Sequence, residues 1–213
     1  MEPNDFFDPT GHDPKTVERI QNHIRLRIAV DYEKVAKKVA AAREFDRRII
    51  LISGSYDIIH EGHMLYLFAG KSCPDDFVIA GLDSDEKVKL RKKKGPHDLR
   101  PFFNQNVRML QLSFLLPIDL VTLKDVSHTK WELIKLIQPD ILQATQETYS
   151  QEEKDALLEW CGQVIVQTPF ATQGTSAHLR RMMLGGAQEL AERIQEKLPN
   201  VVNTSLQEML GKE

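Results

Sequence analysis

The stretch that decides the fold is IILISGSYDIIHEGH, which runs from Ile49 to His63. Its first residues form a short apolar run that ends at Ser53, as in a strand buried on both faces. Gly54 then permits a tight exit from the strand, and His60 to His63 open a helical segment. This stretch predicts a strand, a loop and a helix in that order, which is the first unit of an α/β domain.

Further apolar runs follow at intervals and alternate with helix-like segments. A buried parallel sheet covered by helices on both faces is the arrangement that this alternation predicts. We therefore expect a doubly wound, Rossmann-like five-stranded parallel sheet, with ligands at the carboxyl ends of its strands. The other predicted strands are Phe77 to Leu82, Leu120 to Leu123, Asp140 to Leu142 and Val164 to Gln167, and the helices begin near Glu61, Asp85, Asn104, Thr129 and Gln151.

Helical extensions are expected at both ends, giving an N-terminal extension at 1–46, a main α/β domain at 47–181 and a helical tail at 182–213. Asp13 is a plausible N-cap before Pro14, and apolar residues then recur at helical spacing from Val17 to Ala42. This pattern fits one long helix or two. Its apolar stripe covers either the main domain or a partner subunit, and it favours a homodimer.

Composition excludes several classes of protein. The 213 residues carry a formal net charge of -3, which is too close to neutral for a surface that coats nucleic acid or an anionic membrane. No apolar run is long enough to span a bilayer and no leader pattern follows Met1, so a cytoplasmic protein is expected. Cys73 and Cys161 form neither a disulfide framework nor a metal-binding pair.

His60 and His63 are the chemically distinctive pair. They lie three positions apart in the first turn of the predicted helix, where backbone N–H groups and the helix dipole favour an anion. Gly62 lets a phosphate approach the backbone closely. Short histidine pairs also occur as helix caps or packed core groups, and zinc is disfavoured because the spacing is not HExxH.

The segment GSYDIIHEGHMLYL resembles the first motif of the HxGH nucleotidyltransferase superfamily, written GxFDxxHxGHxxxL. VIAGLDSDEKVKLRKKKG is similar to the second-strand region of the ADP-heptose synthase adenylyltransferase domain and of glycerol-phosphate and ethanolamine-phosphate cytidylyltransferases. RPFFNQNVRM resembles their RPxxxxxxRM segment, IQPDIL their following strand, and TQGTSAHLRR their closing signature. The resemblance covers Arg48 to Arg181 in the order of one known fold.

That resemblance implies transfer of a nucleoside monophosphate from a nucleoside triphosphate to a phosphorylated acceptor, a sugar phosphate, alcohol phosphate or mononucleotide. Mg²⁺ would be bound through the phosphates, with no direct protein ligand. The implied catalytic residues are His60, His63, Lys94 and Arg108, with Lys92 and Lys93 competing for the role of Lys94. The implied nucleotide-binding residues are Gly54, Ser55, Tyr56, Asp57, Gly62, Thr175, Ser176 and Arg180.

Three departures fall where substrate would be chosen. Asn106 replaces an acid, Ala171 replaces the arginine of RTEGIST, and QATQETY at 143–149 replaces KGGDY. The donor can therefore be ATP or CTP, with Arg180 favouring ATP. A nucleotide-binding protein without catalysis, acting through partner docking, is the alternative. A class I aminoacyl-tRNA synthetase relationship ranks last, because the chain is short and has no KMSKS-like segment.

Overall fold

The computed structural model describes residues 1–92, 100–146, 148–168, 170, 184, 185, 188, 190 and 192–197. The chain forms two compact units, Met1–Thr172 and Gln173–Glu213. The first unit contains the sheet and the helices that cover it. The expected boundary at 181–182 lies outside the described residues and stays a prediction.

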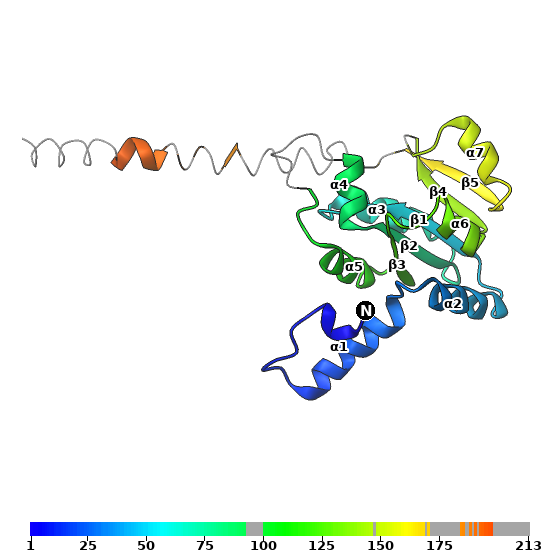
Figure 1. Ribbon diagram of the computed structural model, residues 1–213, viewed down its shortest axis with the longest axis horizontal. Coiled ribbons are helices and arrows are strands. Elements are labelled where there is room, and N and C mark those ends of the chain that lie inside the picture. Colours follow the sequence, from blue (N-terminus) through cyan, green and yellow to red (C-terminus); the bar gives the residue numbers. More distant parts are fainter. Residues whose placement is uncertain are drawn as a thin grey trace, which may run out of the picture. The chain divides into compact units, whose positions relative to one another are not determined.

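A five-stranded parallel sheet is the centre of the first unit (Figure 1). Its strands lie in the order β3-β2-β1-β4-β5, and each neighbouring pair is parallel. The chain thus moves outward from β1 to one edge, then returns to pair β4 on the other side of β1. The doubly wound sheet is confirmed, with its switch point between β1 and β4. The strands are β1 (Ile49–Gly54), β2 (Phe77–Asp83), β3 (Leu120–Lys124), β4 (Ile141–Thr145) and β5 (Gln163–Gln167).

Helices cover both faces of this sheet because successive residues of each strand point to opposite faces. Ile50 and Ile52 pack with α1 (Pro14–Arg27), α3 (Glu61–Gly70) and α5 (Gln105–Ser113). Ile49 and Leu51 pack with α2 (Tyr32–Glu44), α6 (Glu132–Ile137) and α7 (Gln151–Leu157). A short 3-10 helix, η1 (Pro3–Asp5), precedes α1, and α4 (Asp85–Lys92) follows β2.

The N-terminal apolar stripe belongs to two helices, and it is covered by this chain's own sheet domain. Ile28 is extended between them and forms an isolated parallel bridge with Val121, beside the edge strand β3. Asp31 then caps α2 by accepting a bond of 2.8 Å from the Glu33 amide. Ile24 and Val35 are buried on opposite faces of the sheet. A partner subunit is therefore not needed to cover the stripe, and the homodimer stays a prediction.

Two boundaries differ from expectation. α6 begins at Glu132 rather than near Thr129, because Trp131 takes a left-handed conformation with φ 61°. β4 continues to Thr145, so it includes the first three residues of QATQETY, which we expected to be a recognition loop. Gln143 is buried there and donates from Nε2 to the Tyr66 carbonyl over 2.7 Å. The comparison with KGGDY treated this segment as a loop, so it gave no sign that Gln143 is packed inside a strand.

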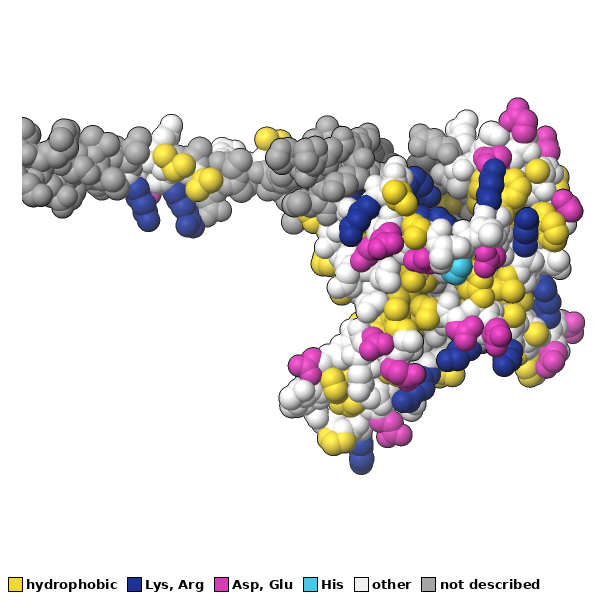
Figure 2. All heavy atoms as spheres, in the orientation of Figure 1, with side chains coloured by type: hydrophobic (Ala, Val, Ile, Leu, Met, Phe, Trp, Pro, Cys, Tyr) yellow, Lys and Arg dark blue, Asp and Glu magenta, His cyan; other side chains and the backbone are white. Residues whose placement is uncertain are grey.

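Charges of both signs are interspersed on the face drawn in Figure 2, where Lys and Arg lie beside Asp and Glu. An anionic ligand on this part of the chain must therefore meet a local group of cations rather than a broad positive field. In the described part of the chain, we find no helix with the length and apolar character needed to cross a bilayer.

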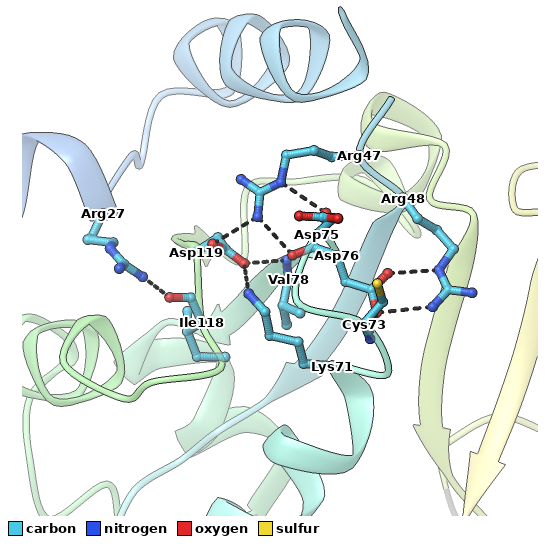
Figure 3. A network of polar contacts seen from close by, with 10 residues as sticks. All are labelled: Arg27, Arg47, Arg48, Lys71, Cys73, Asp75, Asp76, Val78, Ile118 and Asp119. Carbon is cyan, nitrogen blue, oxygen red and sulfur yellow. Dashed lines mark hydrogen bonds and ion pairs between the residues drawn. The ribbon is translucent and has the colours of Figure 1, made fainter. Parts of the chain in front are cut away.

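Carboxylates at the amino ends of the strands accept hydrogen bonds and form ion pairs (Figure 3). Asp119 accepts the Val78 amide over 3.0 Å and forms ion pairs with Lys71 at 2.8 Å and Arg47 at 3.2 Å. Asp76 pairs with Arg48 through two contacts of 2.9 and 3.0 Å. These groups join the loops on both sides of β2 and leave the opposite, carboxyl edge for chemistry.

We expect Asp119→Ala to lower the free energy of unfolding by about 2–4 kcal/mol, because Lys71, Arg47 and the Val78 amide would all lose a largely buried partner. Urea denaturation measures the change. Lys130→Ala is the control, since Lys130 is exposed and its ion pair with Glu153 contributes less than about 1 kcal/mol. Equal losses in the two variants would contradict the prediction.

Candidate active site

His60 lies at the carboxyl end of β1 and is the N-cap of α3. Its Nδ1 accepts the Gly62 amide over 3.2 Å, and its carbonyl accepts the His63 amide over 2.9 Å. Because Nδ1 accepts, the neutral ring carries its proton on Nε2, which can donate to a ligand. His60 is thus a helix cap, as the simpler hypothesis holds, and its other nitrogen suits an anion.

His63 lies against His60, with ring centroids 4.0 Å apart and ring planes 35° apart. The Tyr56 ring meets His63 edge-on at 5.5 Å. The three-residue spacing therefore brings both imidazoles to one face of the first turn of α3, as expected for i and i+3. Two ring nitrogens in such proximity can bind oxygen atoms of a single phosphate chain.

Tyr56 holds the bend between β1 and α3. It has φ 44°, an uncommon value for a residue with a side chain, and its ring is almost fully buried. A Cβ at Gly54 would lie 3.0 Å from the Tyr56 ring, so the glycine leaves room for the aromatic side chain. Burial raises the pKa of the Tyr56 phenol well above its ordinary value, so the hydroxyl stays neutral.

Asp57 ties this loop to the segment before α5. Its Oδ1 accepts the Phe102 amide over 2.7 Å and the Phe103 amide over 3.2 Å. Its Oδ2 is buried and has no hydrogen-bond partner among the described residues. The resemblance assigned Asp57 to nucleotide binding, and the structure adds that it positions two exposed phenylalanines beside the loop.

Arg108 connects three segments from α5. Its side chain is fully buried; Nε donates to the Phe103 carbonyl over 2.9 Å, Nη2 to Asp85 Oδ1 over 2.6 Å, and Nη1 to the Ser55 carbonyl. We expected a phosphate-binding arginine. In this arrangement each of its nitrogens bonds protein oxygen, so Arg108 holds the loop that carries the histidines, and direct contact with phosphate stays a prediction.

Asn106 shows what one departure from the relatives does. Its Nδ2 donates to the Asp5 carbonyl over 3.0 Å and so joins α5 to the N-terminal segment. It also lines a polar hollow of about 470 Å³, formed by Asp85, Glu86, Lys89, Asn104, Gln105, Asn106 and Asp125. The hollow lies on the α4 and α5 side and does not include the two histidines.

Four predicted site residues lie outside the described residues: Lys94, Thr175, Ser176 and Arg180. Lys93 lies outside them too, whereas Lys92 ends α4. The roles assigned to these residues therefore stay predictions.

Sequence reasoning missed a charged group at the same edge of the sheet. Asp83 ends β2 and Lys124 ends β3, and the two are register partners. Only the pairing of the strands places them together, so the motifs gave no signal. The register of two parallel strands, had it been assigned, would have found them.

Binding of Mg²⁺ through the phosphates stays a prediction, and the described residues offer the ion few ligands. They contain no group of three or more His, Cys, Asp or Glu side chains that could hold a metal. Mg²⁺ commonly keeps waters and uses one or two carboxylates together with substrate phosphates. The buried Oδ2 of Asp57 is an unpartnered carboxylate oxygen in the described part of this loop. A cage made by the protein is therefore not expected.

Sequence comparisons agree with the motif assignment. A family model described as "Cytidylyltransferase-like" matches residues 51–204. The chain is 38% identical over 133 residues to the Bifunctional protein HldE of Wolinella succinogenes, covering 62% of this chain and 25% of that protein. It is 37% identical over 111 residues to that of Aliarcobacter butzleri, covering 52% and 22%. The chain thus spans about a quarter of these curated relatives.

Solved structures share the fold at low sequence identity. A lipopolysaccharide core biosynthesis protein from Thermoplasma volcanium superimposes with a TM-score of 0.50 and 20% identity, covering 58% of this chain and 98% of that chain. A pantoate-beta-alanine ligase from Francisella tularensis gives 0.51 and 15%, covering 70% and 68%. These likenesses support the architecture alone.

We expect Arg108→Met to lower the free energy of unfolding by about 3–5 kcal/mol, because the change removes a buried cation and leaves Asp85 without its partner. Chemical denaturation of the full chain measures the loss. Arg19→Met, an identical change on the exposed side of α1, should stay within about 0.5 kcal/mol of wild type. Wild-type stability in Arg108→Met would contradict the structural role of Arg108.

Proposed function

Because this chain belongs to the cytidylyltransferase-like family, we propose that it joins a nucleoside monophosphate unit to a phosphate-bearing small molecule and releases pyrophosphate. Nucleotidyl transfer is the general class of this family's chemistry. The donor is ATP or CTP, and the acceptor is a sugar phosphate, alcohol phosphate or mononucleotide. The observation that supports this most directly is the pair of adjacent imidazoles at the start of α3, with ring centroids 4.0 Å apart.

The proposed reaction is a single in-line displacement. An oxygen of the acceptor phosphate forms a bond to the α-phosphorus of the triphosphate. The bond between the α-phosphorus and the oxygen that bridges it to the β-phosphorus breaks, and that oxygen leaves as part of pyrophosphate. No covalent enzyme intermediate is required. His60, through Nε2–H, and His63 would donate to oxygens of the triphosphate, so that their contacts strengthen as negative charge moves toward the leaving group.

Rigid support makes these donors effective. Asp57, in the β1–α3 loop, accepts the Phe103 amide. Arg108 donates to the Phe103 carbonyl and to the Ser55 carbonyl of the same loop, so the loop is held at two points. Preorganised donors need little rearrangement when the transition state forms, which is how positioned hydrogen bonds accelerate phosphoryl transfer. Bound Mg²⁺ would neutralise charge on the phosphates. By the resemblance, Lys94 would add a cation, and Thr175, Ser176 and Arg180 a second phosphate contact.

We expect His63→Ala to reduce kcat/KM for pyrophosphate release by roughly 100-fold or more, the usual loss when one transition-state donor is removed. Pyrophosphate release is measured with ATP or CTP against a panel of sugar phosphates, alcohol phosphates and mononucleotides. His12→Ala is the matched control, because His12 is exposed before α1, and it should retain wild-type turnover.

Two outcomes would contradict the transfer reaction. One is full turnover in His63→Ala, which would remove the imidazole pair from catalysis. The other is tight triphosphate binding, measured by calorimetry, without pyrophosphate from any donor and acceptor pair. That second result would favour the nucleotide-binding protein without catalysis.

A further inference from the structure

Three charged side chains gather at the carboxyl ends of β2 and β3, apart from the histidine pair. We call Asp83, Arg91 and Lys124 the Asp83 cluster. The Asp83 carboxylate is fully buried, with Oδ2 2.8 Å from Arg91 Nη2 and Oδ1 2.9 Å from Lys124 Nζ. The Arg91 side chain is 52% exposed and that of Lys124 is 19% exposed. A buried anion thus holds two cations, of which Arg91 is half-exposed and Lys124 is mostly buried.

The backbone builds this arrangement. Asp83 and Lys124 are partners in the parallel register of β2 and β3, so their side chains leave the sheet together. A Cβ at Gly81 would lie 3.4 Å from Lys124 Cδ, which shows that the lysine stem passes over this glycine. Arg91 reaches the same carboxylate from α4. The strand register and a helix therefore fix the positions of both cations.

The cluster carries more positive than negative charge. One carboxylate faces the charges of Lys124 and Arg91, and Lys87 lies nearby with Nζ 3.4 Å from the Asp125 carbonyl. Burial, followed by the charges of Arg91 and Lys87, lowers the pKa of Lys124 against the opposing effect of Asp83. Tyr149 is neutral, since burial and Asp83 raise its pKa to about 12. An additional anion would relieve the repulsion between these cations.

The contacts within the cluster leave donors for such an anion. Each oxygen of Asp83 meets one cation, Oδ2 at 2.8 Å from Arg91 and Oδ1 at 2.9 Å from Lys124. An ammonium carries three N–H donors and a guanidinium five, so one contact with Asp83 uses only part of what Lys124 and Arg91 can donate. Phosphate oxygens are strong acceptors for such charged donors.

We propose that the Asp83 cluster binds the phosphate group of the acceptor, with Lys124 and Arg91 donating to its oxygens and Asp83 holding both cations in place. The inference rests on the proposed transfer reaction. In-line displacement brings the attacking phosphate and the leaving pyrophosphate to opposite sides of the α-phosphorus. The histidines lie after β1 at the start of α3, whereas the cluster lies at the ends of β2 and β3. The two phosphate groups therefore have separate donors.

The test is an NMR titration of the full chain with inorganic phosphate, alone and after saturation with α,β-methylene ATP, which cannot transfer its nucleotide. We expect shifts at the amides of Ser84 and Asp125 in both cases. Lys124→Met keeps the stem over Gly81 but removes the charge, and it should weaken phosphate binding roughly tenfold, the size of one charge-assisted hydrogen bond. Arg91→Met, at a half-exposed position, leaves Lys124 as a partner of Asp83 and should act in the same direction.

The control is Lys34→Met, an exposed lysine on α2, which should leave phosphate binding unchanged. Absence of the wild-type shifts, or unchanged binding in both cluster variants, would overturn the inference. Loss of the phosphate shifts on adding the analogue, together with weaker analogue binding in Lys124→Met, would assign the cluster to the triphosphate instead. These readouts need no turnover, so they separate failure of this site from failure of the transfer reaction.

Discussion

The buried guanidinium of Arg108 is the interaction on which the candidate site depends. A cation with no exposed surface is stable only if its charge and its N–H groups are satisfied, and Asp85 with two carbonyls does this. The carbonyls belong to Ser55 and Phe103, so satisfying one side chain fixes the β1–α3 loop against the segment before α5. That loop leads into α3 and so positions the two histidines.

The amino and carboxyl ends of the parallel strands carry different polar groups. At the amino end, Asp119 and Asp140 accept the amides of Val78 and Ile49 over 3.0 and 2.7 Å, so carboxylates satisfy the strand starts. At the carboxyl end, carboxylates such as Asp83 and Asp85 instead hold cations, beside the imidazoles of His60 and His63. Stability is thus concentrated at the edge that a ligand does not approach, which leaves the opposite edge able to carry excess positive charge.

Local patterns predicted the fold well because they act over a few residues. Apolar runs located the five strands, and the capping roles of Asp13 and Asn104 follow from side chains that bond amides three residues on. The histidine pair was predictable for the same reason. The Asp83 to Lys124 contact was not, since 41 positions separate them in the chain and only strand register joins them. The left-handed Trp131 likewise has no local signal, because a bulky residue rarely adopts that conformation.

The departures from related sequences acquire a physical explanation from the fold, and this narrows where substrate choice can lie. Asn106 bonds the Asp5 carbonyl and Gln143 is buried against Tyr66, so these two departures contribute to the chain's own contacts, whereas Ala171 lies outside the described residues. A side chain whose polar atoms are committed inside the protein discriminates poorly between ligands, because recognition needs donors or acceptors that the ligand can meet. At the carboxyl ends of β2 and β3, Arg91 and Lys124 are cations held by a buried carboxylate. Selection by charge and geometry of the acceptor is therefore more consistent with this edge than selection through the replaced residues.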